Sequence, residues 1–493
     1  MPGASQQEVS ALAYQPTRES LREHPVPDWY QDAKLGIFVH WGLYSVPGWA
    51  PTTGKYGEVQ DSTGWATWFA RNPYAEWYLN SLRIEDSPTH QHHLRTYGTG
   101  FAYEDFVPLF NKAIEAWDPH EWAELFQRAG AQYAVLTAKH HDGFLLWPSR
   151  YPNPHQKGYT AGRDLVGEWA AAVLAQGMHV GIYYSGGLDW TFNESPIRDI
   201  VDLPLTVPQG SQYVEYANHH WRELIKLYRP SILWNDIGYP AAADLKALFA
   251  DYYNQIPGGV INDRWLQFRG MGSPIFHSRP VRAVLSWAIR RALSRGTAPP
   301  ASTFFDFRTT EYTSFDQITL QKWESTRGIG YSFGYNQTEG PGQCISVEEL
   351  IRSFVDIVSK NGNLLLNVGP MGDGTIPEIQ RQRLLGLGQW LEVNGEAIFG
   401  TRPWVHADGR TSEGIDVRFT QDGQALYAIL LDSPRQAQVI LESLYVDEGT
   451  TVHLLGHQPA LAWRQEDENL VITLPQGLPD SPAHTLKLTP RQD

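Results

Sequence analysis

Short apolar runs alternate with longer amphipathic stretches along most of the chain, from residue 35 to about residue 370. Eight runs have the length and composition of buried strands, and we predict strands over residues 35–41, 133–141, 178–185, 231–236, 259–265, 304–311, 328–333 and 363–370. Because helical stretches lie between them, the pattern predicts a parallel sheet with helices outside it.

Helix boundaries carry clear signals at three places. Asp164 precedes a helix that stops at Gly177, and Pro230 ends another that starts near residue 211. Ser346 and Glu349 have the spacing of a capping box ahead of an apolar helix face.

Most of the predicted strands end in polar or aromatic side chains. These ends carry His40, Lys139 to Asp142, Tyr183, Asn235-Asp236 and Asn262 to Trp265. In a (β/α)8-like TIM barrel such ends gather in a ring on one face, where active sites lie. A doubly wound open sheet would use a single crevice instead. The spread of polar ends over so many strands favours the α/β barrel.

The pattern changes near residue 401. Asp422-Gly423 lies between two alternating runs, which indicates a hairpin, and short strands are predicted over residues 451–455, 461–463, 470–474 and 484–488. We therefore predict a leading segment over residues 1–34, a catalytic barrel over 35–400 and a small C-terminal all-β sandwich over 401–493.

An Arg-rich segment over residues 266–302 separates two predicted strands. Its arginines include Arg279, Arg282, Arg290, Arg291 and Arg295, and its apolar residues fall at helical spacing. We expect an amphipathic helix that docks beside the site as a lid or subunit contact. A helix on a membrane surface and an insertion without a role are the alternatives.

Composition excludes some classes of partner. The chain has 39 Lys and Arg against 54 Asp and Glu, a net charge of −15, which argues against a nucleic-acid ligand. No stretch approaches the roughly 20 apolar residues that span a bilayer, and residues 1–22 lack an export signal, so we expect a cytoplasmic protein without a membrane partner. The 19 Trp and 24 Tyr suit sugar binding and a large aromatic core equally well.

Retaining hydrolysis of a glycoside needs two carboxyl groups on opposite sides of the anomeric carbon. Asp236 is the candidate nucleophile because it ends an apolar strand, although a helix cap is an alternative role for it. Glu311 is one candidate for the acid/base. The competing carboxyl groups belong to Asp263, Asp306, Glu324 and Glu339.

His40, His140 and His141 raise the question of a metal site. Successive residues on a strand point to opposite faces, and no further ligands complete a set, so we expect no metal, with metal-dependent hydrolysis as the alternative. Hydrogen bonds to sugar hydroxyl groups suit these histidines better.

Several long motifs, in a fixed order, resemble the α-L-fucosidases of glycoside hydrolase family 29. They include KLGIFVHWG at residues 34–42, TAKHHDGF at 137–144, GNLLLNVGP at 362–370, and shorter stretches at 72–78, 183–190, 233–236 and 262–265. The resemblance extends from about residue 21 to residue 404. It implies a retaining exo-glycosidase of fucose and carbohydrate metabolism that releases terminal α-L-fucose without a metal or cofactor.

The resemblance also implies a role for individual residues. Asp236 matches the nucleophile of the family, and Glu311, in the stretch over residues 306–312, matches the acid/base. The residues that match the fucose pocket are His40, Glu76, Trp77, His140, His141, Tyr183 and Arg264. Trp77, Trp234 and Phe333 are expected to form an apolar wall for the methyl group of the sugar.

The expected partner is a fucosylated oligosaccharide or glycoconjugate. The sequence leaves open whether the protein also forms a homo-oligomer. An α-L-galactosidase and an inactive fucose-binding protein are the alternatives. The segment over residues 266–302 departs from the close relatives, in which only a short loop separates the two matching motifs.

Overall fold

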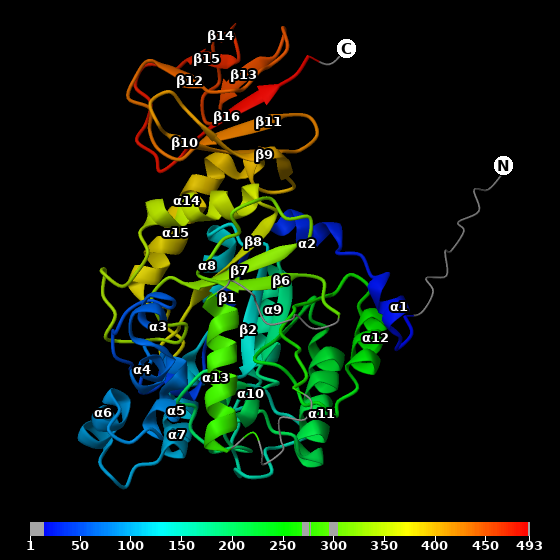
Figure 1. Cartoon of the computed structure of the whole chain (residues 1–493), viewed down its shortest axis with the longest axis vertical. Coiled ribbons are helices and arrows are strands. Elements are labelled where there is room, and N and C mark those ends of the chain that lie inside the picture. The colour runs from blue at the N-terminus through cyan, green and yellow to red at the C-terminus, as the bar shows by residue number, and fades with distance from the viewer. Residues whose placement is uncertain (1–13, 269–275, 277, 295–303, 492–493) are drawn as a thin grey trace, which may run out of the picture.

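The structure is a computed structural model that describes residues 14–268, 276, 278–294 and 304–491. Its centre is an eight-stranded parallel sheet in the order β5-β4-β3-β2-β1-β8-β7-β6 (Figure 1). The strands are β1 (Leu35–Val39), β2 (Tyr133–Lys139), β3 (His179–Tyr184), β4 (Ile232–Asn235), β5 (Val260–Ile261), β6 (Arg308–Glu311), β7 (Trp323–Gly328) and β8 (Gly362–Val368). The predicted α/β barrel is confirmed.

The two ends of this sheet meet just beyond β5. Asn262 forms a parallel bridge with Phe307, and the Asp306 amide donates to the Ile261 carbonyl at 2.8 Å. The Ile261 amide in turn donates to the Asp306 carboxylate at 2.7 Å. Asp306 therefore joins the short strand β5 to the segment that leads into β6, through both its backbone amide and its carboxylate.

Helices connect the strands and surround the sheet (Figure 1). They are α1 (Arg18–Arg22), α2 (Asp28–Ala33), α3 (Glu58–Thr63), α4 (Trp65–Ala70), α5 (Tyr78–Leu82), α6 (Pro88–Tyr97), α7 (Phe106–Ala113), α8 (Pro119–Arg128), α9 (Leu165–Ala175), α10 (Asp202–Thr206), α11 (Ser211–Tyr228), α12 (Leu245–Gln255), α13 (Arg279–Ser294), α14 (Val347–Ser359) and α15 (Glu378–Asn394). None of them is long and apolar enough to cross a membrane, as far as the described residues go.

The predicted helix signals are confirmed. The Asp164 side chain accepts from the Gly167 amide at the start of α9. Ser346 and Glu349 form the capping box of α14. The predicted helix in the Arg-rich segment is also present as α13, whereas Arg295 lies outside the described residues.

One predicted strand is wrong. Residues 328–333 form a loop, and the strand at this place is β7, whose burial is almost complete although its sequence is polar. Glu324 in β7 accepts hydrogen bonds from Tyr30 at 2.9 Å, Tyr133 at 2.6 Å and the Trp234 indole at 3.0 Å. These partners satisfy a carboxyl group inside the barrel, so hydrophobicity alone does not detect the strand.

The C-terminal strands form two antiparallel sheets, in the orders β13-β16-β11-β10-β9 and β12-β15-β14. They are β9 (Arg402–Arg410), β10 (Asp416–Gln421), β11 (Leu426–Leu430), β12 (Gln438–Leu441), β13 (Thr451–Leu454), β14 (Trp463–Glu466), β15 (Asn469–Thr473) and β16 (His484–Thr489). They enclose a hydrophobic core of their own, as the predicted sandwich requires. Arg418 in β10 donates to Asp356 in α14 at 2.6 Å, which ties this domain to the barrel.

Candidate active site

Asp236 directly follows β4, at the carboxyl end of the barrel. Its Oδ2 accepts a hydrogen bond from the Tyr183 hydroxyl at 3.0 Å, and Nε2 of His141 lies 3.9 Å from the same oxygen. Its Oδ1 accepts from Nη1 of Arg264 at 3.0 Å. The apolar strand β4 therefore places the Asp236 carboxylate among three side chains that come from the ends of other strands.

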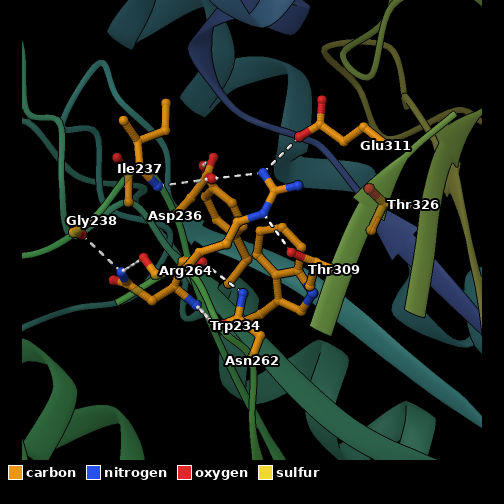
Figure 2. A network of polar contacts seen from close by, with 12 residues as sticks. Trp234, Asp236, Ile237, Gly238, Asn262, Arg264, Thr309, Glu311 and Thr326 are labelled. Atoms are coloured by element: carbon orange, nitrogen blue, oxygen red, sulfur yellow. Dashed lines mark hydrogen bonds and ion pairs between the residues drawn. The ribbon is translucent and has the colours of Figure 1, made fainter. Parts of the chain in front are cut away.

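Glu311 ends β6 on the opposite side of the same guanidinium group. Nη1 of Arg264 lies 2.6 Å from Oε1 of Glu311, and Figure 2 shows this arginine between the two carboxylates. Because contacts of 3.0 Å and 2.6 Å meet at one nitrogen, the two carboxylate oxygens lie at most 5.6 Å apart. Retaining glycosidases have carboxyl groups about 5–5.5 Å apart, whereas inverting enzymes need about 6.5–9.5 Å.

Buried amide groups hold the ends of β4 and β5 together. The Asn262 side chain accepts from the Asn235 amide at 3.1 Å and donates to the Asn235 carbonyl at 2.9 Å. The Asn235 side chain donates to the Arg264 carbonyl at 2.9 Å. These bonds fix the backbone beside Asp236 and beside Arg264, so the two charged groups keep their separation.

The Arg264 side chain is fixed from the side of β6 as well. Its Nε donates to Thr309 Oγ1 at 2.8 Å, and Thr309 in turn bonds to Asp263 at 2.8 Å. Its guanidinium carbon lies 4.9 Å from the centre of the Trp234 ring. Burial would lower the pKa of Arg264, but Glu311 and Asp236 raise it, so the arginine stays charged.

Opposing effects set the charge of Asp236. Burial raises the pKa of this carboxyl above its ordinary value, and Glu311 raises it further, while Arg264 and the Tyr183 hydroxyl lower it. Burial also raises the pKa of Tyr183 well above its ordinary value, so its hydroxyl remains a hydrogen-bond donor. The result is a poorly solvated carboxylate with defined donors.

Two histidines are fixed in one tautomer by their partners. Nδ1 of His141 lies 2.6 Å from Ser185 Oγ, whose own proton goes to the Leu188 carbonyl at 2.7 Å. Nδ1 of His40 lies 2.6 Å from Oδ1 of Asn367. Both Nδ1 atoms must therefore donate, which leaves each Nε2 as an acceptor for a sugar hydroxyl. Burial lowers the pKa of His40 to about 3, so this ring is neutral.

The expectation that His140 and His141 point to opposite faces is wrong. Their ring centroids lie 4.0 Å apart, and His140 also stacks against Tyr183 at 5.7 Å. Strand alternation does not apply because β2 ends at Lys139, after a register shift between Thr137 and Lys139. Both rings therefore belong to the same group of side chains as His40.

Glu76, Trp77 and Phe333 lie next to these histidines. Glu76 Oε2 accepts from the Gly334 amide at 2.7 Å, and burial raises the pKa of Glu76 to about 7. The Trp77 ring meets His141 edge-on at 5.3 Å, and the Phe333 ring lies 5.1 Å from His40. With Trp234, the aromatic side chains named from the sequence all contact members of this group.

The competing carboxyl groups have other partners. Glu324 lies in the barrel interior and Asp306 at the closure of the sheet, where it also contacts His24 at 2.9 Å and Tyr253 at 2.9 Å. Asp263 bonds to Thr309, and Glu339 accepts from the Ser332 amide at 2.7 Å. Among these five carboxyl groups, only that of Glu311 forms an ion pair with Arg264 in the described structure.

Some residues that orient the side chains of the site were not predicted from the sequence. Ser185, Thr309 and Asn367 each orient a charged or imidazole group, and none of them stands out by residue type. Their one signal is position, because each lies within two residues of a candidate site residue or at a strand end. Among the described residues, no group of three or more His, Cys, Asp or Glu side chains is arranged to hold a metal ion.

Comparison with known proteins gives consistent matches over nearly the whole chain. Residues 3–396 match the family model described as Alpha-L-fucosidase, and residues 411–489 match the model of the Alpha-L-fucosidase C-terminal domain. Human tissue α-L-fucosidase is 32% identical over 500 residues, covering 97% of this chain and 92% of that protein.

Solved structures match equally well. The crystal structure of Thermotoga maritima α-fucosidase with a mechanism-based inhibitor is 44% identical, with a TM-score of 0.82, and the match covers 97% of this chain and 100% of that one. The structure of the Thermotoga maritima enzyme in complex with fucose has 44% identity and a TM-score of 0.81, over 97% and 100% of the two chains.

Proposed function

The chain belongs to the α-L-fucosidase family and is a fucose-releasing glycoside hydrolase; from that premise we propose that it acts by double displacement with retained configuration. Asp236 is the nucleophile and Glu311 the acid/base in this proposal. The observation that supports it best is the 5.6 Å upper limit on the separation of their oxygens through Arg264, which suits a retaining enzyme.

In the first step, one oxygen of Asp236 forms a bond to the anomeric carbon and the bond to the leaving oxygen breaks. Glu311 gives its proton to that leaving oxygen. In the second step, water attacks the anomeric carbon, its proton passes to Glu311, and the ester bond to Asp236 breaks. Retention follows because each step inverts the anomeric carbon once.

Electrostatic interactions support the change of Glu311 from an acid in the first step to a base in the second. In the ligand-free protein, Arg264 contacts both carboxylates, and it lowers the pKa of Asp236 against the effect of burial. A substrate whose hydroxyl groups engage Arg264 weakens its contact with Glu311, which frees the Glu311 carboxyl group to donate to the leaving oxygen. Once Asp236 is an ester, Glu311 has already given its proton to the leaving oxygen, so its carboxylate accepts the proton of the attacking water.

The remaining polar groups suit one deoxyhexose. The Nε2 atoms of His40 and His141 accept from hydroxyl groups, Arg264 donates to them, and Glu76 accepts. Phe333 and Trp234 offer apolar surface for the methyl group. The substrates are therefore fucosylated oligosaccharides or glycoconjugates with a terminal fucose.

Product stereochemistry tests the proposal directly. Proton NMR during hydrolysis of an aryl α-L-fucoside should show α-L-fucose before the β-anomer appears by mutarotation. Incubation with a 2-deoxy-2-fluoro-α-L-fucosyl fluoride should add one fluorofucosyl mass to the peptide that contains Asp236. β-L-Fucose as the first product, or a label on a different carboxylate, would refute the assignment.

A further inference from the structure

A cavity of about 590 Å³ lies where α13 meets the loop between β3 and α11. One wall carries Asp199 and Val201, and the other carries Arg282, Ser286, Trp287 and Arg291. An ion pair between Arg282 and Asp202 holds the two walls together, and the Ser286 hydroxyl donates to Asp199 at 3.4 Å. In Figure 1 the lower end of α13 stands beside α10. The helix α13 thus forms one wall of a defined cavity.

Trp287 gives this cavity an unusual surface. Its side chain is 62% exposed, although a tryptophan normally loses most of its surface to a core. The Arg291 guanidinium lies 5.5 Å from the ring centre, which stiffens the aromatic platform at the edge of the helix. A hydroxyl, a carboxylate and guanidinium groups surround it. A flat apolar face with hydrogen-bonding groups around it is the arrangement that recognises a sugar ring.

The cavity is linked to the fucose pocket through a short path. The Ile197 amide donates to Asn80 at 2.7 Å, and the Asn80 side chain returns a bond to the Ile197 carbonyl at 3.1 Å. Asn80 lies three residues after Trp77, whose ring contacts Trp190 in the same loop at 5.5 Å. Two extended residues span about 7 Å and one helical turn about 5 Å. The hydrogen-bonded contact between Asn80 and Ile197 adds the remaining distance, so Asp199 lies within roughly 20 Å of Trp77.

We propose that this cavity binds a sugar ring of the glycan from which fucose is removed, stacked on Trp287. The proposal rests on the fucosidase function, because an exo-acting enzyme holds only the terminal fucose between its carboxylates and leaves the other sugars outside. It identifies the substrate class as fucosylated oligosaccharides with several sugar units beyond the fucose. The Arg-rich segment therefore acts as a specificity element that short fucosides do not engage.

The test compares three variants on long and short substrates. The long substrates are fucosylated penta- and hexasaccharides with α1-2, α1-3, α1-4 and α1-6 linkages, and the short one is an aryl α-L-fucoside. For Trp287→Ala, the ratio of kcat/KM on the best long substrate to kcat/KM on the aryl fucoside should fall about tenfold. Trp287→Phe keeps a flat ring and should restore most of the ratio.

Val284 provides the matched control. It lies on the same helix, is 65% exposed and does not line the cavity, so Val284→Ala should leave the ratio at the wild-type value. Melting temperatures of all variants should match that of the wild type, because both side chains are largely in solvent. The defucosylated form of the best long glycan should inhibit the wild type more strongly than Trp287→Ala.

Two results would overturn the inference. One is a wild-type enzyme that shows no preference for any long substrate over its short counterpart. The other is a ratio that is unchanged in Trp287→Ala. Neither affects the proposed mechanism, which depends on turnover of the aryl fucoside and on its stereochemistry.

Discussion

Asp236 and Glu311 contact the same nitrogen of Arg264, yet their surroundings differ in burial and in support. On the Asp236 side, His40, His141 and Tyr183 are between 1% and 5% exposed, and each has a fixed partner. On the Glu311 side, the glutamate and Arg264 side chains are both 22% exposed. The strand β6 that carries Glu311 is itself exposed or half-buried along its length.

The difference follows from what each side must do. The buried side holds one sugar, so its hydrogen-bond directions have to be fixed before the substrate arrives. The open side has to exchange a proton with water and release leaving groups of different sizes. The Arg-rich segment, which joins β5 to β6, is attached to the open side. Variation in substrate range is therefore expected there and not around the fucose ring.

The largest effect is expected from removal of the buried carboxylate. Asp236→Gly should lower kcat for an aryl α-L-fucoside by at least about 1,000-fold, because the side chain that forms the covalent intermediate is removed. Azide fits the space left by the side chain, so added sodium azide should restore part of the rate. Kinetics with and without azide, followed by NMR of the product, give the measurement.

The anomeric configuration of the fucosyl azide shows which displacement has taken place. One displacement by azide should yield β-L-fucosyl azide. Wild-type-like turnover in Asp236→Gly, or rescue that gives the α-azide, would show that the buried side does not supply the nucleophile.

Removal of the carboxyl group on the open side should have an effect that depends on the leaving group. Glu311→Ala should lower kcat/KM about 100- to 10,000-fold for oligosaccharides, whose leaving oxygen needs a proton. The loss should be much smaller for a dinitrophenyl fucoside, which leaves without one. Rates over a series of aryl fucosides measure this dependence.

Azide provides the counterpart of the first test. In Glu311→Ala it should attack the intermediate on Asp236 and give α-L-fucosyl azide, the opposite anomer to that from Asp236→Gly. An equal loss for good and poor leaving groups would mean that Glu311 supports Arg264 and does not transfer a proton.

The residues of the buried side were easier to predict from the sequence than those of the open side. Polar residues after apolar strands marked His40, His140 and Asp236, since parallel strands bring their carboxyl ends to one face. The motif resemblance was needed to choose Glu311 among five carboxyl groups. Strand position does not distinguish them, because the partners of Asp306 and Glu324 come from residues more than 40 positions away.

The errors share a physical cause. The strand β7 was missed because its buried polar side chains are satisfied by distant tyrosines and a tryptophan. The opposite orientation of His140 and His141 was assumed because the end of β2 could not be fixed to one residue. The cavity beside α13 depends on contacts between segments about 80 residues apart, such as the pair of Arg282 with Asp202. Sequence patterns report local preference, and all three features depend on tertiary partners.

The smallest effect on rate is expected for Glu76. This residue tests whether a buried carboxyl group that binds the sugar also lowers the stability of the folded protein. Glu76 is 2% exposed and has no cationic partner among its described contacts. Glu76→Gln keeps an oxygen that accepts from the Gly334 amide but loses the charge that strengthens a bond to a sugar hydroxyl. We expect kcat/KM for the aryl fucoside to fall about tenfold to 100-fold, mainly through KM.

Glu76→Gln should lower the rate but increase the stability of the folded protein. The gain in stability should appear only above pH 4.5, the ordinary pKa of a glutamate. Burial raises the pKa of Glu76 from 4.5 to about 7, so between these values the unfolded chain loses its proton while the folded protein keeps it. Stability therefore falls as pH rises through this window, by about 3 kcal/mol in total. Glu76→Gln has no proton to lose. Its melting temperature relative to the wild type should rise by about 3 °C between pH 4.5 and pH 8.

Glu392→Gln is the control for this pH dependence, because Glu392 is exposed on α15 and its variant should follow the wild type at every pH. A melting-temperature difference for Glu76→Gln that is flat from pH 4.5 to pH 8 would mean that water or a nearby cation already compensates the buried charge. The fucose side would then be as well solvated as the side of Glu311, and the contrast between the two regions would rest on geometry alone.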